Sequence, residues 1–356
     1  MSLLSTSIPA TSSSADGCQN CSNEGKDEKW TTSVVPVYIL CITVLGIVFN
    51  VFVLMVFCLH KKACTVAEIY LSNLAAADLV LVCSLPFWAV NVAKKYDWIF
   101  GRVLCKLVNI FISVNAYCSI YFLVLVSIDR FVALVHPLTH ERMRRPKYAK
   151  LGCLLVWSLG LLLSVPTIIY REVHFNSTTN ETMCYFNYTD TTVELLCEGV
   201  MPMFGFIIPI FIISFCTCKI IQALNNRSTE GLNTQKVEQK ATTLIMAVLV
   251  AFLICWVPFH LVKIIRLLLT AEVLRSGSLE SIVETYTEIV IYVAFFNSVL
   301  NPILYVIVGK NFQKKVKELF RQWSRNRRAS LSLTTSRFSL SRSVKDPNIS
   351  CRPSRL

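Results

Sequence analysis

Residues 34–59 read VVPVYILCITVLGIVFNVFVLMVFCL, a continuous apolar stretch without a single Asp, Glu, Lys or Arg. A helix rises about 1.5 Å per residue, so roughly 20 apolar residues cross the hydrocarbon core of a membrane, which is about 30 Å thick. Six further stretches qualify, at residues 67–92, 103–135, 149–169, 196–223, 241–269 and 281–307. A closed barrel would instead need short strands of alternating polarity, which these continuous runs are not. The sequence therefore predicts an all-α membrane protein, a bundle of seven transmembrane helices.

The composition also indicates that lipid is the solvent for much of the chain. Hydrophobic residues make up 54% of the 356 residues and charged residues only 16%. Charged residues make up about 25% of an ordinary soluble domain. A soluble protein of this composition would expose far too much apolar surface.

Lys and Arg are unevenly distributed between the two sides of the predicted membrane. The loop between the third and fourth spans and the segment after the seventh are basic, whereas the loops before the fifth and seventh spans are acidic. Because cytoplasmic loops carry the excess of Lys and Arg, we expect an extracellular N-terminus and a cytoplasmic C-terminus in a multi-pass plasma-membrane protein. The net charge of +13 lies largely on the cytoplasmic side, where anionic lipid and a cytosolic partner explain it better than nucleic acid does.

Glycosylation motifs agree with this orientation. N-x-Ser/Thr motifs begin at Asn20 in the N-terminal segment and at Asn176, Asn180 and Asn187 in the loop after the fourth span. All four lie on the predicted outer side, so we predict that they are glycosylated.

Two of the cysteines stand apart from those inside the spans. Cys105 opens the third span on the outer side, and Cys184 lies in the middle of the loop between the fourth and fifth spans. The outer side is an oxidising compartment and the loop is long, so we expect a Cys105–Cys184 disulfide.

Asp78 is an ionisable side chain inside the second span, where a charge is costly and therefore indicates a functional site. The third span adds Asn115 and Ser119 one helical turn apart, and the seventh adds Asn297 and Asn301 at the same spacing. A carboxylate with oxygens converging from three helices is the chemistry of a hydrated sodium site. A polar network that only holds helices together fits the spacing equally well. Apart from this candidate sodium ion, the sequence predicts no cofactor and no metal.

The cytoplasmic ends of two spans carry opposite charges. Asp129 and Arg130 end the third span, and Glu238 begins the sixth at the same membrane level. An Arg130–Glu238 pair that can break would form a two-state latch, although an arginine that merely extends toward interfacial water is the simpler interpretation. Pro258 interrupts the sixth span, where it removes a backbone hydrogen bond and permits a hinge.

Short motifs occur in order along the spans: Asn50, LAAAD at 74–78, Cys105, DRF at 129–131, Trp157, Pro209, CWVP at 255–258 and NPILY at 301–305. As an ordered set across residues 34–323, they resemble the rhodopsin-like G-protein-coupled receptors. The resemblance implies that the five polar residues around Asp78 form a sodium and water network and that Arg130 and Glu238 form the inactive-state lock. It also places Trp256 at the floor of the ligand pocket and Tyr305 at the activation hinge.

Local runs are similar to those of the kinin (bradykinin-type) receptors, namely AEIYLSNL at 67–74, LPFWA at 85–89 and DWIFG at 97–101. This resemblance implies a short basic extracellular peptide as ligand and a heterotrimeric G protein of the phospholipase-C and calcium pathway. Another short peptide, such as an angiotensin-like one, is the second choice.

An acidic outer face attracts a basic ligand over long range. Candidate contacts are Glu198, at the top of the fifth span, and Glu284 and Glu288, at the top of the seventh, although any of them fits a solvated loop charge as well. Arg266 stands high on the sixth span, where the kinin receptors carry an acid, and Lys263 lies one turn below it. We expect these two cations to change the peptide or its pose.

The chain divides into four predicted segments. These are an extracellular N-terminal segment at 1–33, the bundle at 34–309, an amphipathic helix on the inner membrane surface at 310–323 and a disordered cytoplasmic tail at 324–356. The tail is rich in Ser and Thr, and the receptor resemblance implies phosphorylation by receptor kinases and recruitment of arrestin. An inert solvated tail has the same composition.

Other classes of protein fit less well. A transporter would show internal repeats, and the first three and last three spans share no visible pattern. No nucleophile, base and acid converge within the spans, so we expect no enzyme activity. A non-signalling scavenger receptor of the same fold is a further alternative, against which the intact Asp129–Arg130 pair argues.

Overall fold

The computed structural model describes residues 21–60, 64–136, 146–226, 232–274, 277–310, 312–325 and 327, with side chains except those of 21–31, 224–226, 232–242, 244 and 245. Within these residues, seven helical segments are long and apolar enough to cross a membrane, which confirms the predicted seven-helix bundle. They are α1 (Cys21–Leu59), α2 (Val66–Ala93), α3 (Gly101–Val135), α5 (Pro146–Leu163) with α6 (Val165–Tyr170), α7 (Thr191–Pro202) with the π-helix η1 (Met203–Ile207) and α8 (Ile208–Asn226), α9 (Leu232–Thr270) and α10 (Gly277–Ile307).

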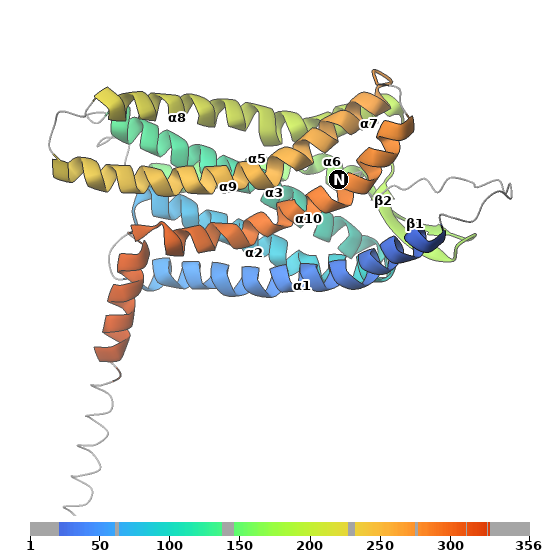
Figure 1. Ribbon diagram of the computed structural model, residues 1–356, viewed down its shortest axis with the longest axis horizontal. Helices are drawn as coiled ribbons and strands as arrows, with labels where there is room; N and C mark the ends of the chain where they lie inside the picture. The colour runs from blue at the N-terminus through green and yellow to red at the C-terminus, as the bar shows by residue number, and fades with distance from the viewer. Residues whose placement is uncertain are drawn as a thin grey trace, which may run out of the picture.

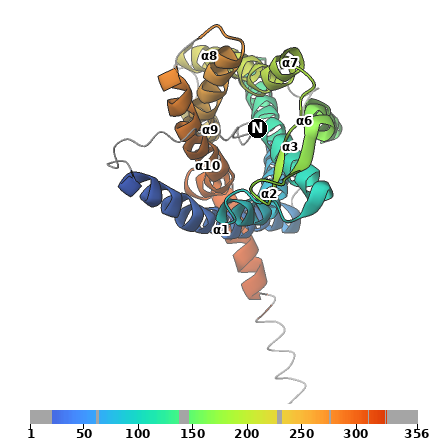
Figure 2. The same cartoon turned by 90° about the vertical axis from the view of Figure 1, so that its right-hand side faces the viewer.

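The helices run side by side along the long axis of the molecule (Figure 1), and from one end they form a ring (Figure 2). Helix α3 packs against α2, α5 and α8, and α1 closes the ring by packing against both α2 and α10. We name the end that carries the strands β1 (Arg171–Asn176) and β2 (Glu181–Phe186) the hairpin end. The opposite end, which α10 reaches at Ile307, is the tail end.

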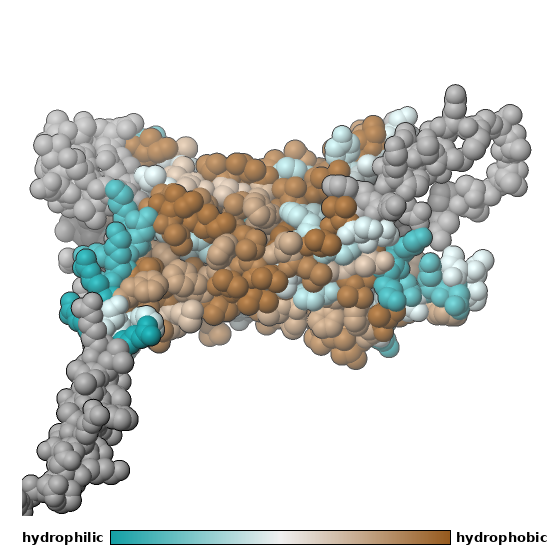
Figure 3. Space-filling model, turned by 60° about the horizontal axis from the view of Figure 1, so that its bottom comes forward, coloured by the Kyte–Doolittle hydropathy of each residue, from teal (hydrophilic) through white to brown (hydrophobic). Residues whose placement is uncertain are grey.

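On the face seen in Figure 3, apolar side chains cover the middle of the bundle as a belt, with hydrophilic residues at both ends. Within the spans Val44, Phe211 and Ile254 are 60%, 76% and 65% exposed. Side chains this apolar would cause aggregation in water, whereas lipid solvates them. The observed surface is therefore that of a membrane protein.

The β-hairpin at the hairpin end of the bundle was not predicted from the sequence. Strands β1 (Arg171–Asn176) and β2 (Glu181–Phe186) pair antiparallel, with Val173 opposite Cys184. The predicted Cys105–Cys184 disulfide is confirmed, and it joins β2 to the first turn of α3.

The loop between α2 and α3 fixes the hairpin a second time. The Trp98 N–H donates to the Thr182 carbonyl at 2.6 Å, and the Thr182 N–H donates to Asp97 Oδ1 at 2.8 Å. The Trp98 side chain is buried beneath this contact. The hairpin is therefore held by one covalent bond and by two hydrogen bonds to this loop.

Residues 312–325 form a further helix that leaves the bundle at an angle (Figure 1). Phe312 is buried, with its ring edge-on to Phe52 and Phe57 of α1. The Lys315 ammonium lies 2.9 Å from the Glu68 carboxylate. An apolar anchor and an ion pair thus attach this helix to the tail end, while Trp323 remains exposed on a face that suits a membrane surface.

The close packing of α1 on α2 yields a stability prediction. A Cβ at Gly46 would lie 2.5 Å from Val82 Cγ1, whereas the nearest atom to a Cβ at Gly152 is 3.4 Å away. Overpacking destabilises a folded protein by about 1–3 kcal/mol. Replacing a helical glycine by alanine stabilises the helix by about 1 kcal/mol. Gly46→Ala should therefore lower the melting temperature of the purified protein in detergent, and the matched Gly152→Ala should maintain or raise it. Equal shifts in both variants would contradict the packing shown for Gly46.

Candidate functional site

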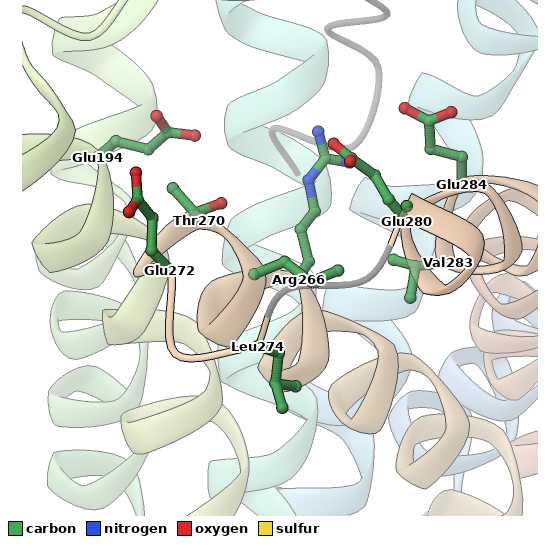
Figure 4. A pocket seen from close by; sticks show the side chains of 10 residues that line it. Glu194, Arg266, Thr270, Glu272, Leu274, Glu280, Val283 and Glu284 are labelled. Carbon is green, nitrogen blue, oxygen red and sulfur yellow. The ribbon is translucent and has the colours of Figure 1, made fainter.

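An acidic cavity of about 550 Å³ opens at the hairpin end between α7, α9 and α10 (Figure 4). Four carboxylates and one guanidinium line it: Glu194, Glu272, Glu280, Glu284 and Arg266. Figure 4 shows the Arg266 side chain extending toward Glu280 and the remaining acids spread around it. The lining is net negative, so the cavity favours a ligand with positively charged groups.

Two of the predicted ligand contacts line this cavity, Glu284 and Arg266, but Glu288 does not. The Tyr96 hydroxyl donates a 2.5 Å hydrogen bond to Glu288 Oε1 and so joins the loop after α2 to α10. Burial, followed by the nearby Tyr292 and Glu288, raises the pKa of Tyr96 well above its usual value. The phenol therefore keeps its proton and remains a donor.

Glu198 and Lys263, predicted as separate ligand contacts, pair with each other deeper in the bundle. Both side chains are buried, and the Lys263 ammonium forms an ion pair with Glu198 Oε2 across α7 and α9. The Tyr188 hydroxyl donates to Glu198 Oε1 at 2.6 Å, and burial, with Glu198 second, raises the pKa of Tyr188 far above its usual value. Removing one member of a buried pair leaves an uncompensated charge and costs about 3–5 kcal/mol.

Trp256 lies in a cluster of aromatic rings on α9. Its ring centroid is 5.7 Å from Phe252, 5.5 Å from Phe259 and 5.8 Å from His260. His260 stacks on Phe206 of η1 at 4.6 Å, which connects the π-helix to α9. Sequence reasoning missed His260, although a histidine one turn beyond Trp256 inside a span was a visible signal.

Asp78 is fully buried and accepts hydrogen bonds from two other helices. Asn115 Nδ2 donates to one carboxylate oxygen at 3.1 Å and Asn301 Nδ2 to the other at 3.0 Å. Asn115 also donates to Ser119 Oγ at 3.2 Å. Asn297 is buried one turn before Asn301, and the carbonyl oxygens of both amides have no hydrogen-bond partner among the described residues. The structure thus brings together Asp78, Asn115, Ser119 and Asn301, with free oxygens available nearby.

At the tail end, Arg130 forms an ion pair with its neighbour Asp129. Glu238 belongs to α9, but its side chain lies outside the described ones, so the Arg130–Glu238 latch remains a prediction. Pro258 lies within α9, and the buried Tyr305 hydroxyl has no hydrogen-bond partner among the described residues.

The predicted glycosylation sites lie at the hairpin end as far as they are described. Asn180 and Asn187 are exposed, whereas Asn176 is partly buried and its Oδ1 accepts a hydrogen bond from the Thr178 N–H at 2.9 Å. Asn20 lies outside the described residues. Glycosylation at all four positions remains a prediction.

Arg171 is a buried cation at the start of β1 that sequence reasoning did not single out. Its guanidinium lies over the Phe186 ring, 4.6 Å from the centroid, and its Nε donates to Cys184 Sγ at 3.4 Å. Burial lowers the pKa of Arg171 to about 10, so the group stays protonated at neutral pH. Arg171 thus contacts the disulfide and does not line the acidic cavity.

Comparison with known proteins agrees with this architecture. The family model of the seven-transmembrane receptors of the rhodopsin family matches residues 49–305. The chain therefore belongs to the rhodopsin family of seven-transmembrane receptors, which are multi-pass signalling receptors of the plasma membrane and not enzymes.

Three proteins that are similar to this chain are all bradykinin receptors. The chain is 41% identical to the B2 bradykinin receptor of Oryctolagus cuniculus over 321 residues, which are 90% of this chain and 86% of that one. It is 45% identical to the B2 bradykinin receptor of Rattus norvegicus over 293 residues, 82% and 74% of the two chains. It is 37% identical to the B1 bradykinin receptor of Homo sapiens over 292 residues, 81% and 82% of the two chains. The resemblance to kinin receptors that the sequence motifs indicated is confirmed.

The Tyr96–Glu288 hydrogen bond can be tested by stability. Tyr96→Phe removes the donor and should destabilise the protein by about 1.5–3 kcal/mol, the usual contribution of a hydrogen bond to a charged group. The measurement is the melting temperature of the purified receptor without ligand. Tyr286→Phe is the matched control, because Tyr286 lies on α10, the helix that carries Glu288, and its side chain is 55% exposed. A loss no larger than that of the control would show that the bond contributes nothing.

Proposed function

We propose that this chain is a cell-surface receptor for a short kinin-like peptide and that it activates a heterotrimeric G protein of the phospholipase-C and calcium pathway. The observation that carries the proposal is the identity of 41% to 45% with B2 bradykinin receptors over most of the chain. The acidic cavity at the hairpin end supports it, because four carboxylates there suit the basic groups of such a peptide.

In this proposal the hairpin end and the N-terminus are extracellular, and the tail end is cytoplasmic. The disulfide at the hairpin end suits the oxidising side of the membrane. The excess of Lys and Arg after the seventh span suits the inner side. The peptide therefore enters the acidic cavity from outside, and the G protein binds from the cytosol.

Activation is a population shift between two arrangements of the bundle. The peptide contacts the third, sixth and seventh spans above Trp256 and stabilises the arrangement in which α9 swings outward around Pro258. This movement separates Glu238 from Arg130 and opens a cleft at the tail end for the G protein. The buried Tyr305 hydroxyl, which has no partner among the described residues, supports a second arrangement, because such an atom is stabilised when it forms a hydrogen bond.

We further propose that Asp78 and its neighbours hold an allosteric sodium ion. A hard monovalent cation prefers carboxylate and amide oxygens, and the partnerless carbonyl oxygens of Asn297 and Asn301 lie on the helix that bonds Asp78. The ion would stabilise the arrangement in which three helices converge on this carboxylate.

The cytoplasmic tail is proposed to be phosphorylated by receptor kinases and then to bind arrestin. The serines and threonines concerned lie beyond residue 327 and outside the described residues. Each phosphate would add about two negative charges to a basic segment and so create a surface for a basic partner.

The ligand class is tested by calcium release in cells that express this chain. Bradykinin peptides with and without their terminal arginines should evoke responses at nanomolar concentrations. The matched control is Arg130→Ala, which should bind labelled peptide normally but release no calcium. If bradykinin peptides release no calcium from cells that carry the unmodified receptor on their surface, while other short peptides do, the ligand is not a kinin.

The polar network yields a prediction about basal activity. Asn115→Ala removes hydrogen bonds to Asp78 and Ser119 and should raise basal inositol phosphate by weakening the inactive arrangement. Thr43→Ala is a suitable control, because the buried Thr43 hydroxyl donates only within its own helix, to the Ile39 carbonyl at 2.9 Å. Unchanged basal signalling of Asn115→Ala at equal surface expression would contradict the proposed role.

A further inference from the structure

We propose that Lys263 binds the C-terminal carboxylate of the peptide ligand and that Glu198 occupies Lys263 until the ligand arrives. The inference rests on the proposed peptide-receptor function and adds to it the residue that recognises one end of the peptide. Ligand binding is then an exchange of one carboxylate for another at a buried ammonium group.

The pair lies between the acidic cavity and a deeper one. A small cavity lined by Glu198 and Lys263 shares Glu194, Arg266 and Thr270 with the 550 Å³ cavity. On its other side the pair lines a cavity of about 30 Å³, which has room for a water molecule. The hydroxyl side chains that line this deeper cavity are Ser113, Tyr117, Thr167 and Tyr188. A ligand in the outer cavity therefore reaches this ion pair through the small cavity that adjoins it.

The chemistry of the pair suits such an exchange. A buried ammonium group needs a counter-ion, because an isolated charge in an apolar interior is very costly. A ligand carboxylate can take the place of Glu198 with Lys263 still paired. Glu198 can keep the 2.6 Å hydrogen bond from Tyr188 while it separates from Lys263. The Glu198 carboxylate and the Lys263 ammonium group therefore each have a partner throughout the exchange.

Two neighbouring cations, Arg266 and Arg171, are poorer partners for a ligand carboxylate. Arg266 shares its cavity with four glutamates, which repel a further anion. Arg171 is stacked on Phe186, and it lines neither the outer cavity nor the two smaller ones beneath it. Lys263 is the remaining cation that the described cavities reach.

The exchange also connects binding to the movement of helices. Glu198 lies on α7 and Lys263 on α9, so their ion pair joins the fifth and sixth spans. When a ligand takes over Lys263, this connection is lost at the extracellular half of α9. The same helix carries Trp256 and Pro258, where the proposed outward movement begins.

The test compares bradykinin that has a free C-terminal carboxylate with its C-terminal amide on four receptors: unmodified, Glu198→Gln, Lys263→Met and the double variant. Calcium release gives the potency of each peptide, and an epitope tag gives surface expression. The unmodified receptor should prefer the free carboxylate by about tenfold or more, as expected for a hydrogen bond to a charged group. Lys263→Met should abolish this preference. Glu198→Gln should increase it several-fold, because the competing carboxylate is gone.

The opposite signs of the two single variants separate ligand recognition from a purely structural role. If the pair only joins helices, both variants weaken both peptides equally, and the proposal is wrong. The double variant removes both charges of the pair, so it should reach the surface and respond to the acid and the amide alike, even if a single variant fails to fold. A retained preference in the double variant would overturn the proposal.

Arg266→Met is the matched control for a neighbouring cation. It should retain the preference for the free carboxylate, and loss of the preference there would assign the carboxylate to Arg266 instead. Silence of the unmodified receptor toward both peptides would overturn the proposed function and this inference with it. Activity with equal potency of the two peptides on the unmodified receptor would overturn this inference alone.

Discussion

The core of a lipid bilayer contains no water, so every backbone N–H and C=O within it must find its partner inside the protein. The chain meets this constraint by crossing as seven helical segments, and in a helix most backbone groups bond within their own segment. The two described strands, β1 and β2, lie at the hairpin end, outside the apolar belt. Even the irregular turn at Met203–Ile207 remains helical, as a π-helix whose wider spacing still satisfies the backbone.

The same constraint decides where polar side chains occur. A charge inside the bundle needs a partner, and the described ones have it: Asp78 accepts from two amides, and Glu198 neutralises Lys263. Along α9, His260 and Trp256 lie one and two turns further from the hairpin end than Lys263. The bundle therefore carries an ion pair above an aromatic layer and a hydrogen-bonded carboxylate elsewhere in its interior. These are the elements that a ligand can shift without exposing the backbone to lipid.

Sequence reasoning succeeded where a single helix carries the information. A run such as 34–59 identifies a span by its length and apolarity alone, and residues four apart, such as Asn297 and Asn301, must share a helix face. It was less complete where contacts join distant segments. The Cys105–Cys184 disulfide was predicted, but the hairpin, its hydrogen bonds to Trp98 and Asp97 and the pairing of Lys263 with Glu198, 65 positions apart, were not. In a membrane helix both the lipid face and the core face are apolar, so periodicity does not reveal which way a charged residue points.

The distribution of charge at the hairpin end gives a physical basis for the orientation of a bound peptide. Carboxylates surround the mouth, and a paired ammonium group lines the small cavity that adjoins it. A peptide with basic groups and a free carboxylate gains most when its cations stay among the outer acids and its carboxylate reaches Lys263, because the reverse orientation opposes like charges at both levels. The resting Glu198 adds selectivity, since a ligand without a carboxylate cannot replace it and leaves the ion pair in place. Specificity here comes from the charge that the ligand must displace as much as from the charges that attract it.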